Sequence, residues 1–292
     1  MQTIKVKAPA KINLTLEILN KREDGYHNIE SIMQAVSLYD YLTISVDDSK
    51  SNAIELSGNN SLIPYDKTNL AYKSAEKFLN KTGITGKKIN IYIEKHIPVA
   101  AGLAGGSADA AAVLYGLNKI FNNALNQKTV SSLASEIGAD VNFCFYGGTK
   151  IATLKGEKLT SVNSPSINLI IVKPKNLFIS AKEAYDKYAK LESKPDYQPT
   201  EKMIQAITQN SPEAIASFLH NGLEYSILPD YEQVKIIKES LIKSGCLNAI
   251  MSGSGPGVFG VLPDNRQIQT TFKDCDVFYA TTMNSGVDLI KV

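Results

Sequence analysis

Cysteine is scarce in this sequence, and its distribution excludes a disulfide framework. The 292 residues contain only three cysteines, Cys144, Cys246 and Cys275, which are far apart and odd in number. They show none of the spacings typical of a metal site. We therefore expect reduced, mostly buried thiols, as is common in cytosolic proteins.

Long hydrophobic runs and an excess of charge are also absent. No apolar run approaches the roughly 18 residues that span a bilayer. Lys5, Lys7 and Lys11 interrupt the N-terminal segment, which excludes the apolar region of a signal peptide. The formal net charge is only +2, and the lysines form no stripe suited to nucleic acid. These features predict a cytoplasmic protein without membrane or nucleic-acid partners, present as a monomer or homodimer.

The chain does have enough apolar material for a sizeable core. Hydrophobic residues make up 43% and charged residues 21%, which is typical of a soluble globular protein. At roughly 100–200 residues per domain, the length predicts two domains. A polar stretch at 155–166 contains Gly156 and Pro165, so we place the domains at 1–158 and 159–292.

Hydrophobic periodicity predicts a mixture of strands and helices. Ile12, Leu14, Leu16 and Ile18 alternate with polar residues, which predicts a strand with one buried face and places Lys11 beside Asn13 on the other. The absence of regular strand–helix alternation favours an α+β fold in each half. We expect further strands at 42–46, 89–93, 149–154, 168–172, 249–251, 258–262 and 277–282, and helices at 69–80, 107–120, 129–137 and 231–243 and after Ser180 and Ser211, with Thr129, Ser180 and Ser211 as N-caps.

A glycine-rich segment, PVAAGLAGGSADAAA, lies between a predicted strand and a predicted helix. Gly102, Gly105 and Gly106 allow backbone N–H groups to turn toward an anion, and the helix adds its positive N-terminal end. Ser107 is placed to cap the helix or to contact a phosphate. No Walker motif occurs in the chain. These residues alone are compatible with a phosphate cradle and equally with a tight strand-to-helix turn.

A second glycine run, Gly255 to Gly260, matches the pattern G-x-G-x-x-G of dinucleotide-binding proteins. Asp274 and Asp276 lie near the distance expected for a ribose contact, so a nicotinamide-dependent oxidoreductase is one hypothesis. However, the residues after the run predict a strand where a helix is required, and too little chain remains for a dinucleotide-binding half. A plain tight hairpin is the other interpretation.

Five segments together resemble the GHMP kinases. The loop at 98–108 resembles their second motif, MSGSGPGVFG resembles the third, and GADVNFC resembles the segment with the catalytic aspartate. The segments KINLTLEILNKREDGYHNIESIMQAVSLYD and NGLE resemble the branch that acts on a cytidine-diphosphate sugar alcohol, and the matches run from Lys11 to about Gly260. The resemblance implies a two-domain α+β fold, with an N-terminal domain like ribosomal protein S5 domain 2 and a C-terminal ferredoxin-like α/β sandwich. It implies ATP-dependent phosphorylation of that alcohol's 2-hydroxyl.

The same resemblance implies roles for individual residues. Asp140 would accept the hydroxyl proton, with Lys11 as its partner. Tyr26 and His27 would form the cytosine pocket, with Tyr185 as a second ring. ATP would contact Pro98, Val99, Ala100, Ala101, Gly102, Leu103, Ala104, Gly105, Gly106, Ser107 and Ala108, and the substrate would also contact Asn13, Ser252, Gly253, Ser254 and Gly255. Mg²⁺ is expected as the counter-ion of ATP, with no ligands assigned.

Plainer roles stay open for these residues. An isolated Asp140 is compatible with a turn or cap, an isolated Lys11 with a solvated strand face, and Tyr185 with helix packing. Lys95 and His96 line the nucleotide site or are simply solvated. Three positions depart from the family pattern: Ala104 replaces a glycine, Asn142 a proline and Gly222 an aspartate.

Two rival functions stay open besides the oxidoreductase. A GHMP kinase for homoserine or a mevalonate-type substrate would have no cytosine to stack on the GYH segment. A non-catalytic binding protein would have no physical reason to keep both Lys11 and Asp140.

Overall fold

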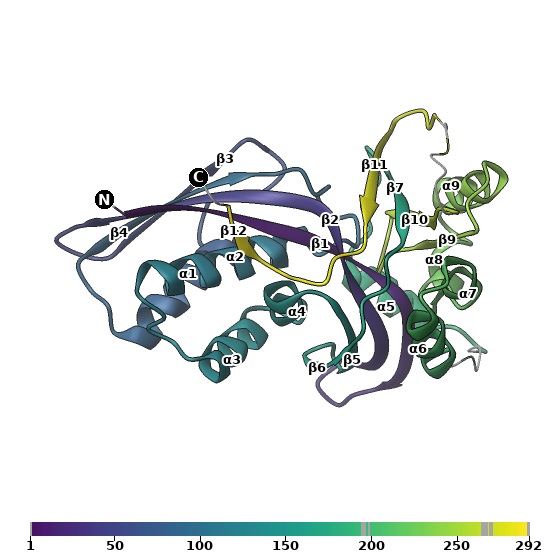
Figure 1. Cartoon of the computed structure of the whole chain (residues 1–292), viewed down its shortest axis with the longest axis horizontal. Coiled ribbons are helices and arrows are strands. Elements are labelled where there is room, and N and C mark those ends of the chain that lie inside the picture. Colours follow the sequence, from purple (N-terminus) through teal and green to yellow (C-terminus); the bar gives the residue numbers. More distant parts are fainter. Residues whose placement is uncertain (1, 194–196, 198, 264–267, 269–270, 291–292) are drawn as a thin grey trace.

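The structure is a computed structural model, and it describes residues 2–193, 197, 199–263, 268 and 271–290. Two β-sheets with helices packed on them account for this part of the chain (Figure 1). The first sheet carries the N-terminal half and has eight described strands, whereas the second has four. The α+β class predicted from the sequence is confirmed.

A long antiparallel hairpin of β1 (Gln2–Lys21) and β2 (His27–Asp48) runs through the whole molecule (Figure 1). Its register shifts between Pro9 and Ala10 and again between Asn13 and Thr15, and such bulges bend a strand and re-aim its side chains. The prediction of one buried face was wrong for the middle of β1, where both faces are buried. The reason is that two loops, described below, cover the face that carries Lys11 and Asn13.

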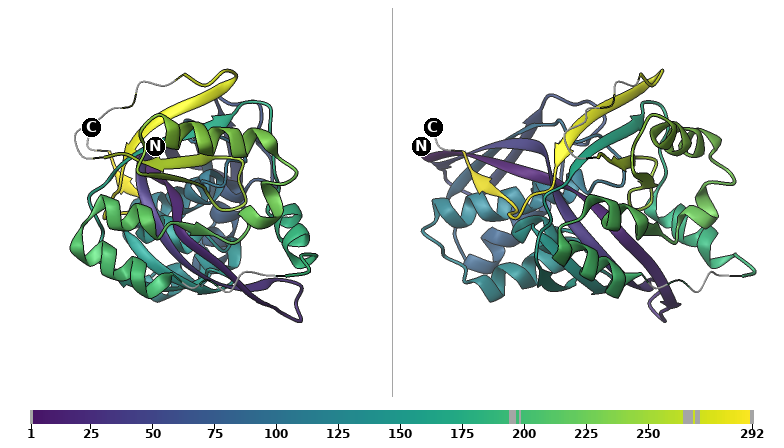
Figure 2. Two further views of the ribbon diagram at one scale, coloured as in Figure 1. Left: turned by 90° about the vertical axis from the view of Figure 1, so that its right-hand side faces the viewer. Right: turned by 45° about the vertical axis from the view of Figure 1, so that its right-hand side comes forward.

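The first sheet has the strand order β12-β1-β2-β4-β3, with β5 pairing with β2 and β6, and β8 pairing with β1. Figure 2 shows from two other sides how β12 returns beside the start of β1. Helix α2 packs on β1 and β2, and α1, α3 and α4 pack around it. The remaining elements are β3 (Ala53–Gly58), β4 (Lys87–Glu94), β5 (Thr149–Leu154), β6 (Lys158–Val162), β8 (His220–Asn221), β12 (Asp288–Leu289), α1 (Leu70–Thr82), α2 (Gly105–Ile120), α3 (Gln127–Ile137) and α4 (Val141–Tyr146).

Two helix starts differ from those predicted. Helix α3 begins after Asn126, whose side chain accepts a hydrogen bond from the Thr129 backbone N–H, so Thr129 is not the N-cap. Helix α2 begins at Gly105 after Ala104, which has a left-handed backbone (φ 57°) and makes no side-chain cap. Ser107 therefore lies inside the first turn and is not a cap.

The second sheet has the order β11-β7-β10-β9, and every pair in it is antiparallel. A strand begins at Val258, inside the G-x-G-x-x-G run, where a dinucleotide-binding fold requires the start of a helix, so the oxidoreductase hypothesis is wrong. Ser180 and Ser211 cap helices as predicted. The elements are β7 (Asn168–Pro174), β9 (Asn248–Met251), β10 (Val258–Val261), β11 (Cys275–Thr281), α5 (Ala181–Ala189), α6 (Thr200–Gln209), α7 (Pro212–Ser217), α8 (Glu224–Ile227) and α9 (Glu232–Lys243).

The hairpin contributes to both hydrophobic cores. Leu16, Ile18 and Ile29 pack with the second sheet, whereas the rest of the hairpin packs with the first helices. Strand β6 pairs with β5 across the predicted boundary, and that boundary stays a prediction. Within the described residues, no helix combines the length and the apolar character needed to cross a bilayer.

Candidate active site

The centre of the site is a buried lysine beside a partly exposed aspartate. The Lys11 Nζ lies 4.0 Å from the Asp140 carboxylate, and the two side chains are 6% and 30% exposed. Lys11 donates to the Asn13 Oδ1 (2.7 Å), and the Asn13 Nδ2 donates to the Ser31 hydroxyl (2.8 Å). Because Lys11 is buried and held, a solvated strand face does not describe it.

Asp140 occupies the N-cap position of α4, yet its side chain makes no capping hydrogen bond. Its carboxylate is therefore not used to hold the helix and faces Lys11 instead. Asp140 is therefore not a simple helix cap, because it lies at the N-cap position without the side-chain hydrogen bond to the helix that defines a cap.

The first glycine-rich loop, residues 98–108, wraps over the start of α2. The Lys11 backbone N–H donates to the Leu103 carbonyl (3.1 Å), which fixes the loop to β1. At the start of α2 the Ala108 N–H donates to the Ala104 carbonyl. The N–H groups of Gly105, Gly106 and Ser107 come before this hydrogen bond, at positions where a helix offers no carbonyl of its own to accept from them. Three such donors at the positive end of a long helix form a site for an anion.

The second glycine-rich loop, residues 252–257, packs directly on the first. The Ser252 hydroxyl donates to the Gly102 carbonyl (3.0 Å), and the Gly257 N–H donates to the Ala101 carbonyl (3.2 Å). A Cβ added at Gly253 would lie 3.3 Å from the Lys11 Nζ. The structure thus brings Ser252 and Gly253 onto Lys11, although they come from the other half of the sequence.

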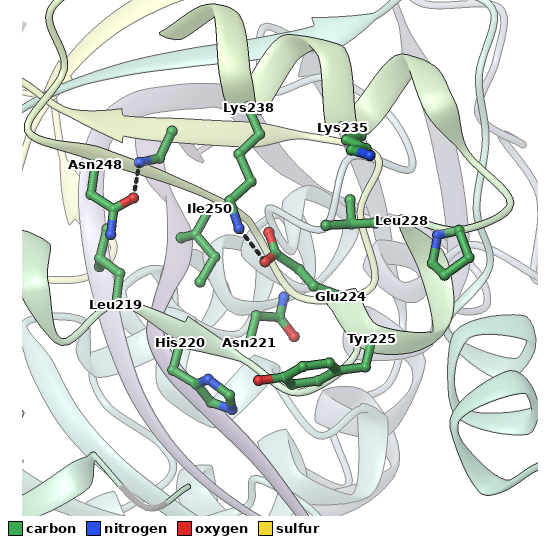
Figure 3. Close-up of a pocket in the computed structure, with 12 residues that line it drawn as sticks. Leu219, His220, Asn221, Glu224, Tyr225, Leu228, Lys235, Lys238, Asn248 and Ile250 are labelled. Atoms are coloured by element: carbon green, nitrogen blue, oxygen red, sulfur yellow. Dashed lines mark hydrogen bonds and ion pairs between the residues drawn. The ribbon is translucent and has the colours of Figure 1, made fainter. Parts of the chain in front are cut away.

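Two residues that sequence reasoning did not assign support this second loop. The Asn221 Nδ2 donates to the carbonyls of Met251 (2.7 Å) and Gly253 (2.8 Å), and Glu224 accepts from the Met251 N–H (2.8 Å). Both belong to the NGLE segment, which was the available signal. Both residues also line a pocket of about 570 Å³. Figure 3 shows the pairing of Glu224 with Lys238 in that pocket.

The aromatic residues of the predicted base pocket are only partly assembled. The rings of His27 and Tyr185 stack with their centroids 5.5 Å apart, whereas Tyr26 is 62% exposed beside Lys155. Burial raises the pKa of the Tyr185 phenol well above its usual range, and the charge of Asp140 adds to this. Tyr185 therefore lies within electrostatic range of Asp140, besides stacking on His27.

A cluster of three buried charges lies under the first loop, and sequence reasoning did not find it. The Lys95 Nζ pairs with Asp40 and with Asp109 (2.8 Å), and the three side chains are at most 3% exposed. Burial raises the pKa of Asp109 to about 7, and the charge of Asp40 adds to this while Lys95 opposes it. The available signal was Asp109 itself, the only acidic residue of the alanine-rich helix α2.

His96 does not join this cluster, because its ring pairs with Glu94 at the surface. Its backbone N–H, however, donates to Asp40 (2.6 Å). The described residues include no group of three or more His, Cys, Asp or Glu side chains that could hold a metal ion.

Comparison with known proteins identifies the family of this chain. The chain matches the GHMP kinases N terminal domain over residues 69–148 and the GHMP kinases C terminal domain over residues 203–273. It is 44% identical to a 4-diphosphocytidyl-2-C-methyl-D-erythritol kinase of Clostridium tetani, covering 92% of this chain and 95% of the relative.

Solved structures agree in fold. A crystal structure of 4-(cytidine 5'-diphospho)-2C-methyl-D-erythritol kinase is 29% identical with a TM-score of 0.76, covering 96% of this chain and 99% of that one. A homoserine kinase from Cytophaga hutchinsonii shares the fold at 20% identity, with a TM-score of 0.73 and coverage of 99% and 98%. The chain belongs to the GHMP kinase family and, within it, to the 4-diphosphocytidyl-2-C-methyl-D-erythritol kinases.

Proposed function

We propose that the protein transfers the γ-phosphoryl group of ATP to the 2-hydroxyl of 4-diphosphocytidyl-2-C-methyl-D-erythritol, a step of the methylerythritol phosphate route to isoprenoid precursors. The observation that carries this proposal is the Lys11–Asp140 pair, which lies where the two glycine-rich loops meet. A kinase for an alcohol needs a held γ-phosphate, an oriented hydroxyl and an acceptor for its proton.

In this proposal each part of the site has one task. Asp140 accepts the hydroxyl proton, and the Lys11 ammonium beside it stabilises negative charge on the transferred group. Asn13 fixes the Lys11 amine through its 2.7 Å hydrogen bond. The residues of the loop at 98–108 bind ATP, with the N–H groups at the start of α2 directed at its phosphates.

The acceptor lies on the opposite side of Asp140 from these phosphates. Tyr26, His27 and Tyr185 hold its cytosine, and the backbone of 252–255 approaches its phosphates. The stacked His27 and Tyr185 rings support this, because a flat apolar surface beside a polar ring suits a pyrimidine. Ser254, between Gly253 and Gly255 in the same loop, would contact the substrate as well.

Mg²⁺ belongs to the proposal as the counter-ion of ATP. Magnesium usually binds through substrate phosphates, waters and one or two carboxylates, and the lack of a three-ligand cluster in the described residues is compatible with that mode. When bound, the ion would neutralise part of the phosphate charge. A cytoplasmic location and a monomeric or homodimeric state are likewise proposals.

A coupled assay of ADP release tests the proposed reaction. We expect turnover with 4-diphosphocytidyl-2-C-methyl-D-erythritol, and none with homoserine or mevalonate, which have no base to stack on His27 and Tyr185. Turnover with either of those alcohols instead would reject the cytosine pocket but keep the kinase chemistry.

The variant Asp140→Asn tests the proton acceptor. An amide cannot accept the hydroxyl proton, so we expect a loss of kcat of about 10²–10⁴-fold, the usual contribution of a general base. ATP binding, measured by calorimetry, should stay within a few-fold of the wild type because Asp140 does not contact the first loop in the proposal. Wild-type turnover in this variant would exclude Asp140 as the base and revive a binding role for the scaffold.

A further inference from the structure

Three buried charged side chains connect the two ends of the first glycine-rich loop. Lys95 follows β4, where the chain enters the loop, and Asp109 lies on α2, where the chain leaves it. Their Nζ and Oδ2 atoms are 2.8 Å apart. Asp40 of β2 pairs with Lys95 and accepts from the backbone N–H groups of His96 (2.6 Å) and Ile97 (2.8 Å). The cluster therefore fixes the base of the loop on both sides.

The cluster lies directly beneath the first residue of α2. A Cβ added at Gly105 would be 2.8 Å from the Lys95 Nζ, so the amine and the helix start are in contact. One ammonium and two carboxylates leave a net charge of −1 when all three are ionised. Of these groups, Asp109 has a buried oxygen, Oδ1, with no hydrogen-bond partner. A buried charge with an unpaired oxygen is costly and favours a proton on that carboxyl.

We propose that Asp109 is a positioning residue of the nucleotide loop and that it takes up a proton from solvent when the phosphates of ATP bind above it. This inference rests on the proposed function, because it requires ATP at the loop. Phosphates add negative charge next to a cluster that is already negative, and one proton on Asp109 makes the cluster neutral. The neutral carboxyl still accepts from Lys95, so the loop keeps its anchor.

The charged groups that act on Asp109 in the described structure are Asp40 from β2 and Lys95, which follows β4. The thiol of Cys144, from α4, is within electrostatic range of Asp109 and also of the Lys11–Asp140 pair. Burial raises the pKa of Cys144 far above neutrality, so the thiol stays protonated and does not compete. From α1, Ser74 donates to the Ala110 carbonyl and carries no charge.

The sign of the pH dependence follows from these charges. Asp109 has a pKa of about 7 without nucleotide, and bound phosphates raise it further. Nucleotide affinity is therefore greatest below pH 7 and falls as the pH rises through 7 toward the raised value. For each unit by which the pKa rises, affinity falls by about tenfold in total across that range.

Calorimetry in buffers of different ionisation enthalpy measures this proton directly, with ADP and Mg²⁺ as the probe and the full chain as the protein. For a one-unit rise we expect the wild type to take up about half a proton more at pH 7.5 than Asp109→Asn, since an amide cannot titrate in this range. Protons bound by ADP itself cancel in the difference. The matched control is Cys144→Ala, which removes the other nearby titratable group and should retain the uptake.

Equal proton uptake by the wild type and Asp109→Asn would overturn the inference. If Asp109→Asn does not fold, the infrared band of a protonated carboxyl decides in the wild type: growth of the band on adding ADP supports the inference, and no change refutes it. Failure of the wild type to bind ADP at all would instead reject the proposed function. A loop that is merely held in place by the cluster would lose affinity in Asp109→Asn without any change in proton uptake, and this too would refute the inference.

Discussion

Replacing Gly253 by alanine tests whether the second glycine-rich loop packs against Lys11, the lysine of the proposed catalytic pair. Gly253 has φ 53°, and an added Cβ would lie 3.2 Å from the Gly102 carbonyl oxygen, 3.3 Å from the Lys11 Nζ and 3.5 Å from the Asn13 Oδ1. The left-handed backbone costs about 1–2 kcal/mol for a non-glycine residue. The contacts force Lys11 to move by a few tenths of an ångström. Because a misplacement of about 1 Å can cost about 10²-fold in rate, we expect a loss in kcat of roughly tenfold.

The matched control is Gly83→Ala. Gly83 caps α1 with φ 69°, and an added Cβ there meets nothing within 4 Å. Both variants should lose a similar free energy of unfolding, measured by urea denaturation, but only Gly253→Ala should lose kcat in the ADP-release assay. Wild-type kcat in Gly253→Ala would refute the contact between this loop and Lys11. Equal losses of kcat in the two variants would mean that backbone strain alone explains the effect.

Three further variants test single features of the structure. Ala104→Gly removes the strain of a left-handed backbone at a non-glycine residue and should raise the free energy of unfolding by about 0.5–1 kcal/mol. A free energy of unfolding below that of the wild type would contradict this strain. Asn142→Ala removes a buried amide oxygen without a hydrogen-bond partner, so the free energy of unfolding, measured by thermal denaturation, should rise by about 1 kcal/mol. A lower free energy of unfolding would mean that the amide is satisfied in the wild type. Asn221→Ala leaves the carbonyls of Met251 and Gly253 unpaired, so the free energy of unfolding, measured by urea denaturation, should fall by about 2–3 kcal/mol, and kcat should also fall. Unchanged kcat would mean that Asn221 does not position the loop.

Much of the fold was accessible from the sequence because local patterns determine it. The alternation around Ile12, the caps at Ser180 and Ser211, and the strand after Gly257 all depend on neighbours close in the chain. The loop at 98–108 was recognisable for the same reason, since its glycines and the following helix form one short segment. The pairing of Lys11 with Asp140 came instead from family resemblance.

What the sequence could not predict depends on contacts between distant segments. The burial of both faces of β1 arises from loops that lie on it, and periodicity cannot reveal a cover that comes from elsewhere in the chain. The short helices α4 and α8 lack the length that gives a periodic signal. In the cluster of Asp40, Lys95 and Asp109, the two ends of one loop meet a residue 55 positions before Lys95, and no local pattern indicates that meeting.

The return of the last strand to the first sheet has a consequence for synthesis of the protein on the ribosome. Residues 282–290 follow the second sheet, yet the Met283 N–H donates to the Ala35 carbonyl (2.8 Å), Gln34 donates to the Met283 carbonyl (2.9 Å), and β12 pairs with β1. The N-terminal sheet is therefore incomplete while that segment is still inside the exit tunnel, although all of its other strands have already emerged. Closure of this sheet, and with it the final placement of the hairpin that carries Lys11, must wait until residues 282–290 have left the exit tunnel.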